Sequence, residues 1–329
     1  LAQQRLARAE ARSPRDAGRV HNVTYLCLHR MGRHDDALAH AQQGLALARA
    51  AGDLNTEAAI RTNIGVNAME ATQVEQALSH YQQALELYQA AGNRSGVINV
   101  RVNLGQIEIT LGRNQPAHDL MQRALQDCRE IGARRFEAMA CANLAGSLCE
   151  LGQAEQGYAL ALEGLRLARI TGESRTEAFA QHSAQLAAGL LGRHGDALDH
   201  ARLATAAFKA HGDLGTGWIS EASAVRALQS LGRREEARAA ADALLAEVDA
   251  QGGWGDAFEP PYHLHTVLAS QGDPRAARLL ADAHQALMAQ AEQLTRFVPR
   301  EEFLRSTMGT RGVCDAWARA QGSTRTAPH

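Results

Sequence analysis

Three asparagines stand forty residues apart in this sequence, at Asn63, Asn103 and Asn143. An asparagine amide carries both a hydrogen-bond donor and an acceptor, so it complements one peptide unit of a main chain. At about 0.5 to 1.5 kcal/mol for each contact, three such amides would raise the affinity for a peptide roughly a hundredfold. Arg61 and Arg101 keep the same spacing and are candidates to meet a carboxylate, although most such arginines only face solvent.

Further residues join this candidate face when the sequence is counted in helical steps from the asparagines. Phe179 and Leu186, with Leu190 and Ile219, would form an apolar patch for hydrophobic side chains of a ligand. The full set of candidate peptide-binding residues is Asn63, Asn99, Asn103, Gln106, Asn143, Phe179, Leu186 and Arg226. Two alternatives stay open. The asparagines bond across to a neighbouring repeat and only fix helix packing, or the apolar residues belong to the core.

Signals for catalysis and metal binding are weak. The close histidine pairs are His29/His34, His194/His200 and His263/His265. The sequence contains no HExxH string, no G-x-S-x-G string and no phosphate-binding P-loop. Its five cysteines form no C-x-x-C pair, so no zinc site is indicated. We therefore expect a protein that is not an enzyme and that holds neither a metal nor another cofactor.

Composition narrows the class of partner. The formal net charge is -2 over 329 residues, so no basic field is available to hold a phosphate backbone, and we expect no nucleic-acid partner. No apolar run approaches the roughly 18 residues that a membrane span needs, and the first ten residues lack the apolar core of a signal peptide. We expect reduced, mostly buried thiols in a cytoplasmic protein that does not bind a membrane.

A period of forty residues runs through the chain. One set of glycines keeps it, with Thr72 in the vacant position: Gly32, Gly112, Gly152, Gly192, Gly232 and Gly272. A second set follows at Gly52, Gly92, Gly132, Gly172, Gly212 and Gly252. Between the two sets lies a small residue, at Ala37, Ala77, Ala117, Gly157, Ala197, Ala237 and Ala277. A self-similar period of this length is typical of helical solenoids.

The pattern inside each unit is helical. Residues 77–88 read ALSHYQQALELY, which places apolar residues at the i, i+3, i+4, i+7 spacing of one buried stripe. The second set of glycines would enter the left-handed conformation that ends such helices, and the small residues would let paired helices approach closely. We predict an all-α superhelix of about seven helix-turn-helix repeats, closed by a helical cap at its C-terminal end.

These repeats resemble the tetratricopeptide family. The similarity is carried by Leu104, Gly105, Gly112, Ala117, Ala124 and Leu125 in one unit, and by Gly65, Ala77, Tyr81, Ala84 and Leu85 in the unit before it. Family repeats usually have 34 residues and a proline after the second helix, whereas here that helix runs on to a glycine. The resemblance is therefore to the longer variety, as in kinesin light chains and helical regulatory domains of large bacterial signalling proteins. It covers roughly residues 1–295 and implies that extended peptides bind through asparagines.

The two ends suggest how the chain is organised. By phase, Leu1–Ala11 corresponds to the latter part of a second helix, which is the pattern of a piece of a longer polypeptide with further domains. After Gln293 the period is lost. Pro299 and the apolar residues beyond it predict two short helices that shield the last repeat, followed by a disordered tail. We thus divide the chain into a repeat solenoid, residues 1–295, and a cap with its tail, residues 296–329.

The glycine-rich stretch at 251–265 replaces an ordinary turn between helices. A functional loop there is one possibility. We favour the other, in which Pro260 and Pro261 begin the next helix while Trp254 and Phe258 fill a local gap.

Taken together, the sequence predicts a scaffold or sensor that binds a protein or peptide segment in a groove lined by the first helix of each repeat. It would be the C-terminal part of a larger bacterial signalling or transcriptional regulator. The alternative function is a structural spacer or self-association module with no ligand in the groove, which includes a homo-oligomer.

Overall fold

The computed structural model describes residues 13–71 and 73–325, and these contain α-helices and no strand. The predicted all-α fold is confirmed for them. The helices in the first part are α2 (Pro14–Arg30), α3 (His34–Ala50), α4 (Leu54–Glu70), α5 (Val74–Ala90), α6 (Arg94–Thr110), α7 (Asn114–Ile131), α8 (Arg134–Glu150) and α9 (Ala154–Thr171). The rest are α10 (Ser174–Leu190), α11 (His194–Ala210), α12 (Leu214–Ser230), α13 (Arg234–Ala250), α14 (Glu259–Ser270), α15 (Arg275–Leu294), α16 (Arg300–Leu304) and α17 (Met308–Arg325). The predicted helix at Leu1–Ala11 lies outside the described residues.

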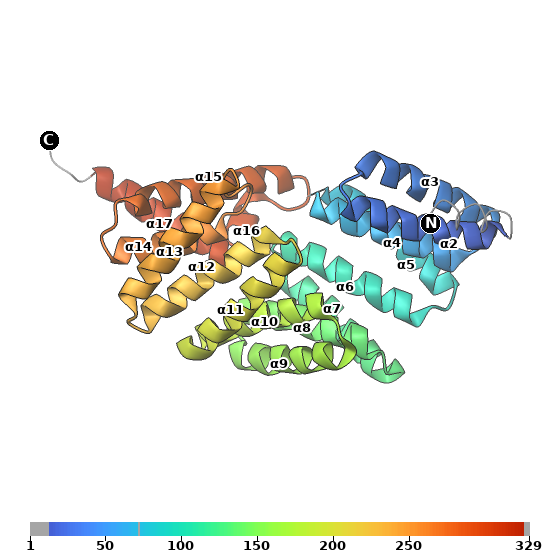
Figure 1. Ribbon diagram of the computed structural model, residues 1–329, viewed down its shortest axis with the longest axis horizontal. Coiled ribbons are helices and arrows are strands. Elements are labelled where there is room, and N and C mark those ends of the chain that lie inside the picture. Colours follow the sequence, from blue (N-terminus) through green and yellow to red (C-terminus); the bar gives the residue numbers. More distant parts are fainter. Residues whose placement is uncertain (1–12, 72, 326–329) are drawn as a thin grey trace. The chain divides into compact units, whose positions relative to one another are not determined.

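Consecutive helices pack as antiparallel pairs joined by short turns (Figure 1). The chain forms two compact units, which we describe separately. Unit 1 comprises residues up to 107 together with 126–136, and unit 2 comprises 108–125 together with 137–329. The even-numbered helices from α4 to α14 are the first helices of their repeats, and the odd-numbered helices from α5 to α15 are the second helices.

The second helix α5 shows why the pattern folds as it does. Ala77, Tyr81, Ala84 and Tyr88 are buried along one stripe, as their spacing predicts. The Tyr81 ring lies where a side chain at Gly65 on α4 would sit, because an ideal Cβ there would come within 2.6 Å of it. A glycine in the first helix therefore makes room for an aromatic ring in the second.

The turns that follow the second helices share a glycine that ends the helix. Glycine ends the second helices with a positive φ, for example 71° at Gly172 and 77° at Gly212, which confirms the predicted left-handed caps. One residue later, a polar side chain caps the next helix. Asp53 accepts a hydrogen bond from the Thr56 amide at 3.2 Å, and Asp213 does the same for Thr216 at 3.1 Å.

Small residues also allow the backbones of paired helices to approach closely, as between α8 and α9. Gly157 stands where other repeats carry alanine, and a Cβ there would lie 2.9 Å from the Ala145 carbonyl oxygen and from the Cys149 sulfur. Farther along α9, Gly164 faces the α8 main chain at Ala138 and Ala142 in the same way, at 3.2 Å. The two backbones are thus in contact along α9.

Apolar residues from α11 to α15 form the largest described core cluster of unit 2. Trp254, from the glycine-rich stretch, packs against Trp218 at 6.1 Å between ring centroids and at 88°. Pro260 and Pro261 are buried in the first turn of α14. The stretch therefore fills a gap and starts a helix, as expected.

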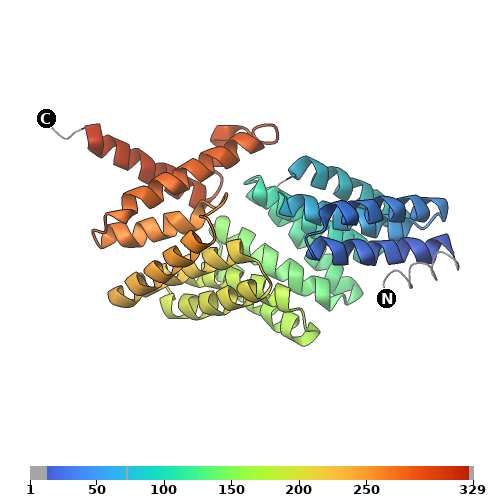
Figure 2. The same cartoon turned by 45° about the horizontal axis from the view of Figure 1, so that its top comes forward.

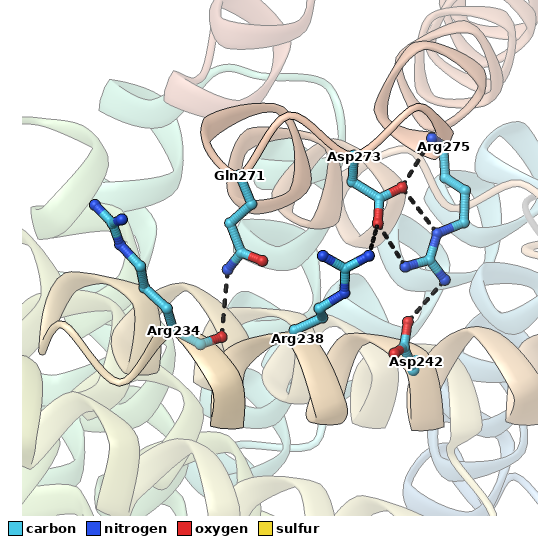
Figure 3. Close-up of polar contacts among 6 residues, drawn as sticks. All are labelled: Arg234, Arg238, Asp242, Gln271, Asp273 and Arg275. Carbon is cyan, nitrogen blue, oxygen red and sulfur yellow. Dashed lines mark hydrogen bonds and ion pairs between the residues drawn. The ribbon is translucent and has the colours of Figure 1, made fainter.

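A buried carboxylate ties α13 to the turn before α15 (Figure 3). Asp273 accepts hydrogen bonds from Arg238 at 3.0 Å and from Arg275 at 2.7 Å, and Arg275 also pairs with Asp242 at 2.7 Å. Hydrogen bonds from Arg275 hold the pKa of Asp273 far below its usual range, although burial works in the opposite direction. This network fixes one repeat against the next.

Two helices, α16 and α17, follow the last repeat, and α17 crosses α15 (Figure 2). Trp317 of α17 stacks on His284 of α15 with 4.3 Å between ring centroids. Phe303 of α16 is buried. The boundary at residue 295 and the tail stay predictions, although helix α17 extends to Arg325.

Candidate functional site

The candidate residues lie on the first helices and belong to two units. Asn63 on α4, and Asn99, Asn103 and Gln106 on α6, lie in unit 1. Asn143 on α8, Phe179 and Leu186 on α10, and Arg226 on α12 lie in unit 2. We therefore examine each half of the candidate site within its own unit.

Asn63 is engaged in helix packing. Its amide nitrogen donates to the side-chain oxygen of Asn22 on α2 at 2.9 Å, and its main-chain carbonyl accepts from the Tyr25 hydroxyl at 3.4 Å. For this residue the alternative of a bond to the neighbouring repeat describes the structure. A peptide would have to break the bond to Asn22 before Asn63 could hold it.

The amides on α6 are more available. Asn99 and Asn103 are half-buried, and Gln106 is exposed. Within the described residues the side chains of Asn99 and Asn103 make no hydrogen bond to protein. Their donors and acceptors are therefore open to a ligand on this face of unit 1.

The two periodic arginines of unit 1 pair with carboxylates of the chain itself. Arg61 is buried and donates to Glu57 at 2.8 Å, and Arg49 donates to the same oxygen at 2.9 Å. Burial alone would raise the pKa of Glu57, but hydrogen bonds from Arg49 and Arg61 hold it below its usual range. Arg101 pairs with Asp127. These ion pairs give both arginines a structural role.

In unit 2 the candidate residues follow a row of neighbouring first helices. Ser183 on α10 donates to the Ala142 carbonyl on α8 at 2.8 Å, which joins the first two helices of the row. Asn143 is half-buried and makes no hydrogen bond through its side chain within the described residues. Arg226 is exposed, and its guanidinium group has no carboxylate partner in the described part of the chain. Asn143 thus offers an amide, and Arg226 a positive charge, to a ligand.

The apolar candidates in unit 2 are divided between surface and core. Phe179 is half-buried and packs edge-on against the buried Phe208 of α11, with 5.0 Å between ring centroids. Leu186 is also half-buried, and Leu190 is 44% exposed. Phe179 therefore contributes to the core while Leu186 and Leu190 keep accessible apolar surface.

A polar cluster on α10, α12 and α14 was not among the predicted residues. His182 lies 3.0 Å from the Ser220 hydroxyl, and the Ser223 hydroxyl lies 3.4 Å from His263. Burial lowers the pKa of His182 to about 4 and that of His263 well below its usual range. Both imidazoles are therefore neutral near pH 7 and act as hydrogen-bonding groups. The sequence held a signal for His263 only, because Asn143, Ser183, Ser223 and His263 share one phase of the forty-residue period.

Two half-buried carboxylates, Glu150 and Glu259, come from the first and the last helix of this row. Burial and, to a smaller extent, the nearby Glu150 carboxylate together raise the pKa of Glu259 on α14 to about 7. Burial likewise raises the pKa of Glu150, against the effect of a hydrogen bond from the Met308 amide. Within the described residues no group of three or more histidine, cysteine or acidic side chains is arranged to hold a metal ion.

A small cavity of about 250 Å³ lies elsewhere, in unit 1. It is lined by Tyr88, Gln89, Gly92, Asn93, Arg94, Val97, Arg101 and Asp127. Its volume is below the roughly 300 to 1,000 Å³ of typical ligand pockets. None of the eight candidate residues lines it.

No cysteine in the described part of the chain forms a disulfide. Cys128, Cys141 and Cys149 are buried, while Cys27 is exposed. No helix in the described part of the chain combines the length and apolar character needed to cross a membrane.

The paired helices with their forty-residue period define a helical-repeat protein of the superhelical class. Residues 24–90 and 56–130 match the family model of the tetratricopeptide repeat. Residues 24–130 therefore match tetratricopeptide repeats, and the fold of the described residues is similar to that of proteins with such repeats. A comparison with curated proteins found no match.

Several solved structures have a similar fold. A STAND (signal transduction ATPase with numerous domains) protein with a tetratricopeptide repeat sensor, from Pyrococcus horikoshii, is 15% identical with a TM-score of 0.54. The match covers 85% of this chain and 45% of that protein, so our chain spans less than half its length.

Two Rap proteins are also similar. One, in complex with competence and sporulation factor, is 16% identical with a TM-score of 0.59, over 97% of this chain and 98% of that one. The other, a Rap conjugation gene regulator of the plasmid pLS20 in complex with the Phr peptide, is 13% identical with a TM-score of 0.54, over 83% and 78%. At these identities the similarity shows the fold alone.

Proposed function

We propose that this chain is a peptide- or protein-binding scaffold or sensor, and that its ligand lies on the accessible face of the first helices. The single observation that carries the proposal is the set of amides without a protein partner. Asn103 in unit 1 and Asn143 in unit 2 stand at the same repeat position and make no side-chain hydrogen bond within the described residues. Such amides complement a peptide main chain.

The neighbouring groups support the same class of ligand. Arg226 supplies a positive charge without a carboxylate partner in the described chain, and the neutral His182 and His263 supply further hydrogen-bonding groups. Leu186 and Leu190 add accessible apolar surface. This mixture suits an extended peptide with an acidic or polar group near Arg226 and an apolar side chain over α10.

The wider context is part of the proposal. Similar folds occur in a signalling ATPase and in Rap regulators, one of them holding a Phr peptide. We infer that the chain serves a larger bacterial regulator in the cytoplasm, with other domains of the same polypeptide as further partners. Nucleic acid and membranes are not the partners we propose.

The test is selection from a displayed peptide library, followed by affinity measurement of the selected peptide on single variants. Asn103→Ala should weaken binding of a peptide held by unit 1, and Asn143→Ala that of a peptide held by unit 2, each about 2- to 12-fold, since one hydrogen bond is removed. Arg226→Ala should weaken binding of a peptide with an acidic residue by at least as much. The matched controls are Gln82→Ala and Arg166→Ala, because both residues are exposed on second helices. Equal affinity of all five variants would refute the proposed face.

A second candidate function is self-association, one of the two roles in the alternative set out above. Leu162 on α9 and Leu203 on α11 are 39% and 53% exposed on neighbouring second helices. If the library yields no peptide and the protein forms a dimer that Leu203→Glu dissociates in sedimentation, self-association is favoured over peptide binding.

A further inference from the structure

The main chain between α15 and α17 is held by side chains from a distant part of unit 2. We call residues 297–308 the C-terminal segment. Arg113 donates to the carbonyl oxygen of Phe297, and Asn114 donates from its amide nitrogen to the carbonyl oxygen of Ser306 at 3.0 Å. These pairs are separated by 184 and 192 residues in sequence.

A third contact has the opposite polarity. The main-chain N–H of Met308, the first residue of α17, donates to Glu150 Oε2 at 2.9 Å. The Thr307 hydroxyl accepts from the Thr310 amide at 3.1 Å and so caps the same helix start. Glu150 lies at the last position of α8, so the two helix ends meet at this bond.

These contacts differ from ordinary packing between repeats. The arginines at the position equivalent to Arg113 pair close by: Arg193 with Glu155 at 3.5 Å, and Arg233 with Glu236 at 2.6 Å. Arg113 also pairs close by, with Glu108 at 3.6 Å, but it donates in addition to a main-chain carbonyl on the far side of four repeats. A cap of a solenoid needs to contact only the repeat beside it.

All three contacts are made to main-chain atoms of the C-terminal segment. Two donors meet carbonyl oxygens and one acceptor meets an N–H, so none of the three depends on which side chains the segment carries. A segment of different sequence could therefore make the same bonds. The Arg113 side chain is 38% exposed, whereas Val298 and Phe303 of the segment are buried.

The Glu150 contact combines an unfavourable and a favourable contribution to stability. Burial raises the pKa of Glu150, which means that its carboxylate is held in an unfavourable environment. The bond from the Met308 amide offsets this cost in part.

We propose that the C-terminal segment is an internal ligand: Arg113, Asn114 and Glu150 form a site for main-chain atoms of a peptide, and the segment occupies it until a partner peptide displaces it. The partner's entry rests on the proposed function, whereas the opening of the segment can be tested without a partner.

The decisive variant is Met308→Pro, with Met308→Ala as its matched control. Proline is tolerated in the first turn of a helix, so α17 is kept while the N–H that Glu150 accepts is removed. Alanine shortens the same side chain but retains the N–H. In the full chain, amide hydrogen exchange of residues 297–307 should become about tenfold faster in Met308→Pro and stay within about twofold of the wild type in Met308→Ala. Equal exchange in the two variants overturns the proposal.

A second pair tests the other end of the segment. Arg113→Ala should accelerate exchange near Phe297, whereas Arg233→Ala removes the same residue from an equivalent turn and should leave this region unchanged. If Arg233→Ala has the same effect as Arg113→Ala, the change is general destabilisation and the assignment is wrong.

The ligand site itself is tested with a labelled synthetic peptide of residues 296–309. It should bind Met308→Pro at least about tenfold more tightly than the wild type, whose own segment competes. Equal binding to both proteins, or none to either, would show that no separable main-chain site exists. If Asn143→Ala and Arg226→Ala leave a library-selected peptide unaffected while Met308→Pro still opens the segment, the proposed function fails and the internal ligand stands.

Discussion

The contact at Gly157 leads to a prediction that opposes the repeat pattern. Six of the seven repeats carry alanine at this position, so a consensus argument would recommend Gly157→Ala as a stabilising change. Replacing a helical glycine by alanine gains about 1 kcal/mol from the unfolded-state entropy and helix propensity. The structure predicts that this gain is lost here.

The cost follows from what a Cβ at Gly157 would meet. The Ala145 carbonyl oxygen would lie 2.9 Å away, and it belongs to the α8 main chain, which cannot turn aside as a flexible side chain can. Helix α9 would have to move away from α8, and overpacking of this kind costs about 1 to 3 kcal/mol. We therefore expect Gly157→Ala to destabilise unit 2 by about 1 kcal/mol in total.

Gly146→Ala is the matched control, because Gly146 lies inside α8 and the nearest atom to its added Cβ would be the Ser183 hydroxyl at 3.7 Å. That variant should be stabilised by about 0.5 to 1 kcal/mol. Urea denaturation gives the overall change, and hydrogen exchange of α8 and α9 amides gives the local one, since repeat arrays need not unfold in one step. Stabilisation of Gly157→Ala equal to that of Gly146→Ala would refute the reasoning.

Three further predictions concern the core, the carboxylates and the caps. Phe208→Ala should lower the free energy of unfolding by about 3 to 5 kcal/mol because Phe208 is fully buried, whereas Leu203→Ala on the same helix should change it by less than about 0.5 kcal/mol; urea midpoints decide. Because the pKa of Glu259 is raised to about 7, its carboxyl group loses the proton at lower pH in the unfolded state than in the folded state, and the wild type loses stability as the pH rises from 5 to 7. The stability of Glu259→Gln relative to the wild type should therefore increase over this range, by up to about 1.4 kcal/mol per pH unit. A stability difference in urea denaturation that does not change with pH would contradict this. Asp53→Ala removes the cap of α4 and should lower the free energy of unfolding by about 1 kcal/mol, measured by thermal unfolding. Asp53→Asn, whose side chain can still cap the helix, should retain most of the wild-type stability.

The period of the sequence was sufficient to predict the fold. Positive φ at glycines such as Gly172 and the buried stripe of α5 are local consequences of residue type, and they recur because the pattern recurs. Contacts between adjacent repeats also follow from the period, since each repeat meets the next at a fixed offset.

The candidate site was less predictable, because identical residues in the same register have different neighbours. Asn63 and Asn103 occupy one position of the period, yet Asn63 meets Asn22 on α2, whereas Asn103 has no such partner in the described chain. The difference depends on the residue that the preceding repeat presents. A ladder of asparagines in the sequence therefore identifies a face, and the local partner decides which of its members is available to a ligand.

Contacts across several repeats were beyond the reach of periodicity. A forty-residue period specifies what lies one repeat away, but the meeting of Arg113 with Phe297 depends on the small rotations of all the repeats between them. A change in any intervening turn would shift this contact, although it would leave each nearest-neighbour contact nearly intact. Bonds such as that between Glu150 and Met308 are therefore more sensitive to the curvature of unit 2 than any part of its core, and a ligand that altered that curvature would act on them first.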